Sequence, residues 1–320
     1  MFFTRSFYIL STHTQTCLPS KTKRRLGESL SRNPSTSSSG AQTRVDASLS
    51  RYQQRNEVIL RWDPHGKFIR FNEGNELVQH LMVNYSKAKR AHENRDGGIG
   101  SLLQPHQTLT ITGTESDEKT SDRSRYDVID FLADLGVNVR YVPDYGWIYS
   151  TMSDEDIESI IDYYIDRVNW LCEQINEEEL DHVELIPLAK GLHRDHYQRA
   201  VEIYEKHDID RIAMYGVQTP SIKKFVRRVE QAINVIDPEG VLVIGKQSPE
   251  DVHRLPDRVD GTAGFWNWKT TCGLTKDGYS SEALAQWHHK ISRATRNGRT
   301  TQQIDLKTAS QQEVESNGRR

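Results

Sequence analysis

The feature that most constrains this chain is a regular alternation of strand-like and helix-like segments between residues 58 and 270. Short runs rich in Val, Ile and Leu precede longer segments whose apolar residues recur at helical spacing. In the clearest helical segment, apolar residues fall at i, i+3, i+4, i+7, i+8, i+11 and i+14 counted from Ile157. Strands that alternate with helices through short loops indicate a parallel α/β sheet.

The strand ends favour one parallel architecture over another. No GxGxxG and no GxxxxGK[ST] motif follows any strand-like run, so neither a dinucleotide fold nor a P-loop is supported. A TIM-type (β/α) barrel is the better interpretation, because it places its chemistry on the loops that follow the strands. Only six or seven strands are identifiable in the sequence, so the barrel is expected to be incomplete or decorated. We expect it to span residues 56–292.

The two ends of the chain have a different composition. Residues 1–55 and 293–320 are rich in Ser, Thr, Gln and Arg and lack apolar periodicity, which predicts a disordered basic leader and a disordered polar tail. A targeting segment is the alternative interpretation of the leader. The three cysteines, Cys17, Cys172 and Cys272, are far apart, which indicates a reducing compartment, the cytoplasm.

Bulk charge and hydropathy exclude some partners. The formal net charge is −3, so the chain as a whole has no electrostatic attraction for nucleic acid, and local basic stretches would have to supply it. No apolar run approaches the roughly 18 residues of a membrane span, so no membrane partner is expected.

Two carboxylates are predicted to lie where strands end. Asp144 occurs in VPDYGWIYS and Asp260 in RVDGTAG. In a barrel, such positions face one mouth, and a pair of carboxylates there suits displacement at the anomeric carbon of a sugar. The alternative is structural, because an Asp at a strand end is often a turn residue or a helix cap.

Four segments of the chain also resemble a known family in their order and spacing. They are DYGWIYSTMSDEDIESIIDYYIDRV, LIPLAKGLHRDHYQRAVEIYEKHDIDRIAMYGV, VLVIGKQSPEDV and RVDGTAG, within about residues 106–270. Together they are similar to landmarks of the tRNA-guanine transglycosylase superfamily.

The resemblance implies roles for particular residues. Asp260 would be the nucleophile that bonds to C1′ as guanine departs, and Asp144 would be the acid/base. Glycines would allow the backbone to approach the base, and two aromatic residues would stack on it. The implied substrate-binding residues are Tyr145, Gly146, Trp147, Lys190, Gly191, Gly216 and Gly245.

The chain departs from the family in ways that narrow the implied reaction. Lys190 precedes Gly191 where the tRNA-modifying enzymes have Gln, one Asp-ended strand has no counterpart, and the cysteine-rich zinc region is missing. These departures favour the branch that inserts 7-deazaguanines into DNA.

The implied activity is therefore exchange of guanine for a preQ0-type 7-deazaguanine in a polynucleotide, in DNA rather than tRNA. It would proceed by double displacement without metal or other cofactor, and helper proteins could open the duplex. Two alternatives remain open: a catalytically inactive barrel that serves as a nucleic-acid-binding or assembly subunit, and an unrelated barrel enzyme that acts on a phosphorylated metabolite.

Two further groups of residues are candidates for binding. An aromatic and basic stretch after the last strand could grip a phosphate backbone and stack on unpaired bases; its members are Trp266, Trp268, Lys269, Lys290 and Arg293. His193 and His196 are three residues apart, a spacing that can bind metal. No third ligand is evident near them in the sequence, so no metal site is predicted.

Overall fold

The computed structural model of the protein describes residues 56–121 and 123–295. All of them belong to one compact unit, Arg51–Arg320. The predicted leader, residues 1–55, lies outside the described residues, as do residues 296–320.

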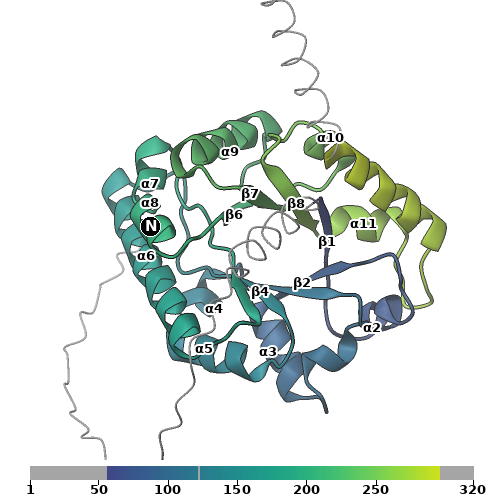
Figure 1. The fold of residues 1–320 in the computed structure, drawn as a ribbon. Coiled ribbons are helices and arrows are strands. Elements are labelled where there is room, and N and C mark those ends of the chain that lie inside the picture. The colour runs from purple at the N-terminus through teal and green to yellow at the C-terminus, as the bar shows by residue number, and fades with distance from the viewer. Residues whose placement is uncertain (1–55, 122, 296–320) are drawn as a thin grey trace, which may run out of the picture. The chain divides into compact units, whose positions relative to one another are not determined.

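The described residues form an α/β fold around one parallel sheet of eight strands, in the order β5-β4-β3-β2-β1-β8-β7-β6. The sheet curls into a TIM-like half-barrel (Figure 1). One isolated parallel bridge joins Leu188, just after β5, to Ala213 of β6. The strands are β1 (Glu57–Arg61), β2 (His80–Asn84), β3 (Thr108–Thr112), β4 (Val139–Val142), β5 (Val183–Leu185), β6 (Arg211–Tyr215), β7 (Gly240–Ile244) and β8 (Val259–Gly264).

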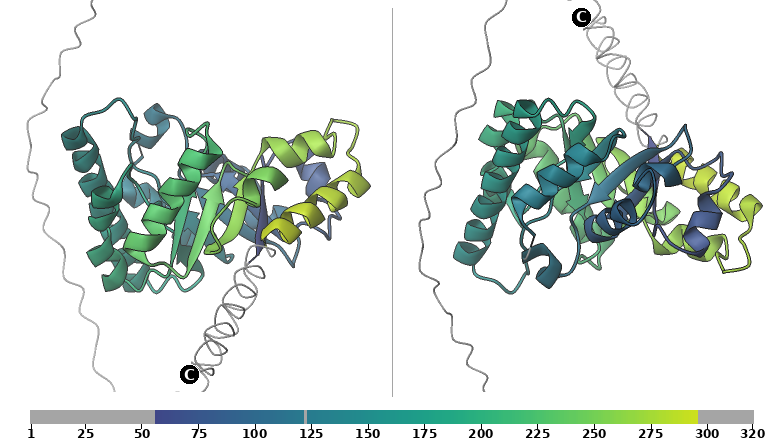
Figure 2. Two further views of the ribbon diagram at one scale, coloured as in Figure 1. Left: turned by 90° about the horizontal axis from the view of Figure 1, so that it is seen from above. Right: turned by 90° about the horizontal axis from the view of Figure 1, so that it is seen from below.

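Helices cover the outside of the curled sheet (Figures 1 and 2). They are α2 (Lys67–Asn72), α3 (Tyr85–Glu93), the 3-10 helix η1 (Ile99–Leu102), α4 (Asp117–Ser121), α5 (Arg125–Asp134), α6 (Asp154–Glu177), α7 (Arg194–Gln198), α8 (Val201–Lys206), α9 (Ile222–Ile236), α10 (Pro249–Val252) and α11 (Trp266–Thr271). Residues 281–295 form a last helix on the side of α11. None of the helices in residues 56–121 and 123–295 is both long and apolar enough to cross a membrane.

Helix α6 shows how the sequence pattern produces packing. The Ser153 side chain accepts a hydrogen bond from the backbone of Asp156, so the helix begins with a capped first turn. Its apolar stripe is buried against the sheet, as the spacing predicted, and Ile160 at the edge of the stripe is half-buried. From this stripe the buried hydroxyl of Tyr164 accepts a hydrogen bond from the backbone of Leu188, at 2.6 Å.

Three details differ from the sequence-based expectation. Strand β2, with the sequence HLMVN, was not anticipated and brings the number of described strands to eight. The sequence predicts one helix from Asp195 to His207, and the structure divides this segment into α7 and α8. The predicted tail boundary at 292/293 falls inside the last helix, which continues to residue 295 because Ile291 and Thr295 are buried on its inner face.

Candidate functional site

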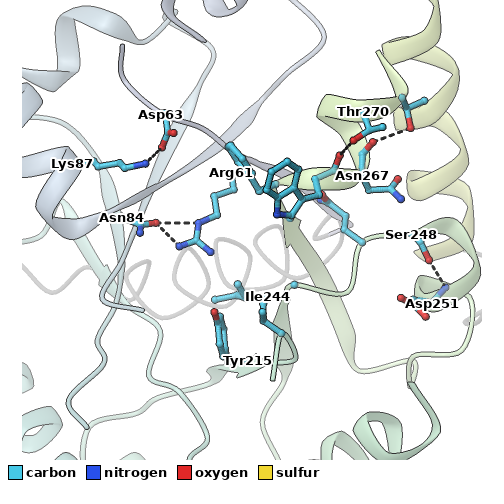
Figure 3. Close-up of a pocket in the computed structure, with 17 residues that line it drawn as sticks. Arg61, Asp63, Asn84, Lys87, Tyr215, Ile244, Ser248, Asp251, Asn267 and Thr270 are labelled. Atoms are coloured by element: carbon cyan, nitrogen blue, oxygen red, sulfur yellow. Dashed lines mark hydrogen bonds and ion pairs between the residues drawn. The ribbon is translucent and has the colours of Figure 1, made fainter. Parts of the chain in front are cut away.

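The carboxyl ends of the strands surround a cavity of about 690 Å³, here called the rim cavity. Its lining comes from the ends of β1, β2, β6, β7 and β8 and includes Arg61, Asn84, Tyr215, Gly245 and Trp266. Figure 3 shows the side chains that line it. In parallel α/β folds the loops at this edge of the sheet carry the functional groups, so the rim cavity is the first candidate site.

Arg61, the last residue of β1, directs its guanidinium group into the rim cavity (Figure 3). Its Nε donates to Asn84 Oδ1 at 3.0 Å and its Nη2 donates to the backbone oxygen of Thr114 at 3.3 Å. Both acceptors are neutral, and Arg61 forms no ion pair with any carboxylate in the described residues. Its guanidinium is therefore oriented by neutral acceptors, which leaves its charge able to pair with a bound anion.

Aromatic side chains lie on the wall of the rim cavity. Tyr215 ends β6 and is half-buried, with its ring below the Arg61 guanidinium in Figure 3. Trp266 is 70% exposed, and the Lys269 amino group lies 4.5 Å from its ring centroid. An exposed indole beside an ammonium group can stack on a planar ligand.

A second space of about 60 Å³, here called the side recess, shares Tyr215 with the rim cavity. Asp144, Trp147, Lys190 and Arg228 contribute to its lining. Lys190 Nζ lies 2.5 Å from Asp144 Oδ1 and also donates to the backbone oxygen of Gly146. The structure therefore places Asp144 and Lys190 together at the carboxyl end of the sheet, as a nearly buried ion pair.

Two further donors of the side recess have no acceptor. Trp147 Nε1 is buried without a hydrogen-bond partner, and so is Arg228 Nε. The rest of the Arg228 guanidinium is fixed by Gly191 O at 2.8 Å and Thr219 Oγ1 at 3.0 Å. Unsatisfied buried donors are uncommon in folded proteins and indicate that an acceptor can bind beside them.

The glycines expected to approach a base make room for neighbouring parts of the chain. A Cβ on Gly191 would lie 2.6 Å from the Cβ of His196, and the φ of Gly191 is +146°. A Cβ on Gly216 would lie 2.8 Å from Lys246 Cγ, and one on Gly245 would lie 2.3 Å from Val217 Cγ2. Gly191 and Gly245 still contribute backbone to the side recess and the rim cavity, respectively.

Asp260 lies at the opposite end of the sheet from Asp144. It is the second residue of β8, and Asp144 comes two residues after the end of β4. Because all strands are parallel, the beginning of one and the end of another lie at opposite edges. The expectation that both carboxylates face one mouth is wrong, since Asp260 begins its strand instead of ending it.

Asp260 belongs to a buried ion network at the amino-terminal edge. Arg211 Nη2 lies 2.9 Å from Asp260 Oδ1 and 2.8 Å from Glu57 Oε2. Arg140 Nη2 is 2.9 Å from Glu57 Oε1. Burial would raise the pKa of Glu57, but the two arginines hold it at about 2, well below its usual value. The network is buried at the amino-terminal edge of the sheet, so the role of Asp260 there is structural.

Most of the other predicted site residues do not face the rim cavity or the side recess. Tyr145 is 1% exposed, so its ring is not available to stack on a base. The carbonyl oxygen of Gly146 accepts a hydrogen bond from Lys190.

Trp268, which was predicted to contact nucleic acid, is fully buried, and its Nε1 donates to Gly264 O at 3.1 Å. That prediction is therefore wrong for Trp268. Lys290 and Arg293 are exposed on the last helix and line neither the rim cavity nor the side recess.

Several site residues were not anticipated from the sequence. Arg61, Asn84 and Tyr215 are the last residues of their strands. Arg228 points inward from α9. The available signal was their position, because a polar or aromatic residue that ends a buried strand faces the functional edge of a parallel sheet.

No protein-family model matches the sequence, and the curated proteins include none with significant similarity to it.

Proposed function

We propose that the chain binds a nucleotide unit of a polynucleotide at the carboxyl end of its sheet, and that it acts by binding. The observation that carries this proposal is the Arg61 guanidinium, which is directed into the rim cavity without a carboxylate partner in the described residues. A phosphate oxygen is the anionic group that a fixed guanidinium binds best.

The size and lining of the site fit a nucleotide. The rim cavity has a volume of about 690 Å³, within the range of small-molecule sites. With a phosphate on Arg61, a base could lie against Tyr215 or Trp266, which line the same cavity. The unpartnered Trp147 Nε1 of the adjoining side recess could donate to a carbonyl or ring nitrogen of the base.

A neighbouring groove extends the positive surface away from the rim cavity. This basic groove has a volume of about 810 Å³, shares Asp63 and Lys87 with the rim cavity, and is lined further by His65, Arg90 and Arg95. A polynucleotide whose nucleotide occupies the rim cavity could place its next phosphates along this groove. This continuity favours a polymer over a free phosphorylated metabolite.

Binding of fluorescently labelled single-stranded DNA and RNA to the full chain tests the proposal. Arg61→Gln removes the charge at the rim cavity, and Arg227→Gln removes an exposed charge on the outer helix α9. We expect anisotropy titrations to show binding that Arg61→Gln weakens roughly tenfold or more and Arg227→Gln leaves nearly unchanged. Equal affinity of the Arg61 variant and the parent protein, or no binding of either polymer, would overturn it.

Base exchange is the second candidate function, because the structure places Asp144 at the same rim, next to Lys190. In this form of the reaction the Asp144 carboxylate would attack C1′, the bond from C1′ to the guanine nitrogen would break, and guanine would leave and take a proton from solvent. The incoming 7-deazaguanine would then displace Asp144 from C1′ and lose its ring proton to solvent. Asp260 would have no part in it.

An exchange assay separates the two candidates. The chain is incubated with labelled guanine or preQ0 and with either duplex DNA or tRNA, and label in the polymer is counted. Uptake that Asp144→Asn abolishes would support exchange. If the polymers bind but take up no label, the chain acts by binding alone.

We also propose that the sheet closes as a complete TIM-type (β/α) barrel. The bridge between Leu188 and Ala213, with hydrogen bonds from Ala213 N to Pro187 O at 2.7 Å and from Ala189 N to Ala213 O at 2.8 Å, supports this. In a closed barrel all eight strand ends would surround one mouth. Protection of the Ala213 amide proton from exchange with solvent would test the closure.

A further inference from the structure

Three side chains of the kinds that bind metal ions meet where the loops after β4 and β5 approach each other. Asp154 is the first residue of α6, His193 precedes α7, and His196 lies within α7. One potential ligand atom from each lies within 4.8 Å of the other two. The sequence indicated only the histidine pair, because Asp154 comes from a different loop.

The three side chains lie close together, but they do not satisfy one another's hydrogen-bonding groups. His193 Nε2 lies 3.6 Å from Asp154 Oδ1, which is longer than a hydrogen bond. The two imidazole rings are stacked with centroids 3.6 Å apart. His196 is fully buried, and its Nε2 has no hydrogen-bond partner.

We propose that Asp154, His193 and His196 bind a divalent transition-metal ion, with Zn²⁺ the best fit. Two imidazole nitrogens and one carboxylate oxygen are a ligand set that zinc uses, with a fourth position left for water. The exposed Asp154 and the half-exposed His193 leave a path by which the ion and its water could enter.

Binding at His196 Nε2 requires a change of tautomer. The Nδ1 of His196 accepts a hydrogen bond from Leu192 N at 3.2 Å, so the neutral ring carries its proton on Nε2. When the metal takes Nε2, that proton moves to Nδ1 and the bond from Leu192 is lost. The Leu192 N–H is then left without its acceptor, which costs much less free energy than a metal site typically gains.

The consequence of this site would be to fix the side recess. The ion would tie the start of α6 to the segment that follows Lys190 and Gly191, and both of these residues line the recess. The site does not depend on the identity of the ligand in the rim cavity.

Metal titration of the full chain, freed of metal with a chelator, tests the proposal. Zn²⁺ binding is measured by calorimetry, and Co²⁺ replaces it to give a visible spectrum that reports the ligand geometry. Asp154→Asn and His193→Ala alter exposed or half-exposed side chains, so both variants should fold. Asp166→Asn and His253→Ala are the matched controls at exposed positions elsewhere.

We expect one Zn²⁺ per chain and a rise in melting temperature on its addition. The Asp154 and His193 variants should bind Zn²⁺ roughly tenfold or more weakly, and the controls should bind it as the parent protein does. Absence of binding in the parent protein, or unchanged affinity in both ligand variants, would overturn the proposal.

Discussion

Arg211 and Asp260 form an ion pair of 2.9 Å at the amino-terminal edge of the sheet, and the Asp144–Lys190 pair of 2.5 Å lies at the opposite edge. The first pair belongs to a buried network that also includes Glu57, and the second pair lines the side recess.

Replacing Asp260 should affect stability and leave binding intact. Asp260→Asn leaves the buried Arg211 with one carboxylate partner fewer, and breaking a buried pair costs about 3–5 kcal/mol. Urea unfolding should show this loss, and Asp166→Asn at an exposed position of α6 should show almost none. Loss of polynucleotide affinity in folded Asp260→Asn would contradict the division of roles.

Stability should fall in mild acid because of His80. Burial lowers the pKa of His80 from 6.5 to about 4; the Glu57 carboxylate opposes this shift, and Arg140 and Arg211 add to it. Between these two pH values the unfolded chain binds more protons than the folded chain, so the free energy of unfolding decreases as the pH falls. From about pH 7.5 to about pH 5 we expect a loss of about 2 kcal/mol from this residue.

The variant His80→Gln isolates that contribution. Its free energy of unfolding should depend less on pH over the same interval, whereas the exposed control His253→Gln should behave as the parent protein does. An identical pH dependence in His80→Gln and the parent protein would contradict the assignment.

Loss of the Tyr164 hydroxyl should lower the stability of the fold more than loss of the hydroxyl of its neighbour Tyr163. Tyr164→Phe leaves the backbone N–H of Leu188 without its acceptor in a buried place, which costs about 1–3 kcal/mol. Tyr163 is 48% exposed, so Tyr163→Phe should change stability by less than about 0.5 kcal/mol. Chemical denaturation of both variants checks the difference, and equal stabilities would contradict it.

Gly191 should tolerate no larger side chain. Gly191→Ala places a Cβ 2.6 Å from His196 Cβ at a backbone φ of +146°, so the loop that carries Lys190 must shift. Gly136 also has a positive φ, of +62°, but open space around its Cβ position. We expect Gly191→Ala to lower the melting temperature more than Gly136→Ala does and to weaken ligand binding as well. Equal effects would contradict the packing argument.

Much of the fold was predictable because its signals are local. The stripe of α6 and the strand-like runs follow from hydrophobic periodicity, and the alternation of the two implies a parallel sheet. Strand β2 was missed because HLMVN is short and continuous in apolar character, a pattern that a buried helix can share.

The site was less predictable because it depends on where strands begin and end. A shift of a few residues decided whether Asp260 lies at the mouth or at the opposite end of the sheet, and periodicity fixes boundaries poorly. Asp144 and Lys190 were placed at the correct edge, since both follow their strands. Arg61 is part of no recognisable sequence motif, and its orientation toward the cavity depends on a hydrogen bond to Asn84 from another strand. It could therefore not be predicted from the local sequence.

The junction between β5 and β6 has a mechanical consequence. Strand β5 has three residues, and one bridge joins its continuation to β6, whereas five paired positions join β6 to β7. We expect thermal opening to start along this short seam, which is flanked by Lys190 on one side and Tyr215 on the other. A bound molecule in contact with both residues would therefore hold the two edges of the sheet together and oppose this opening.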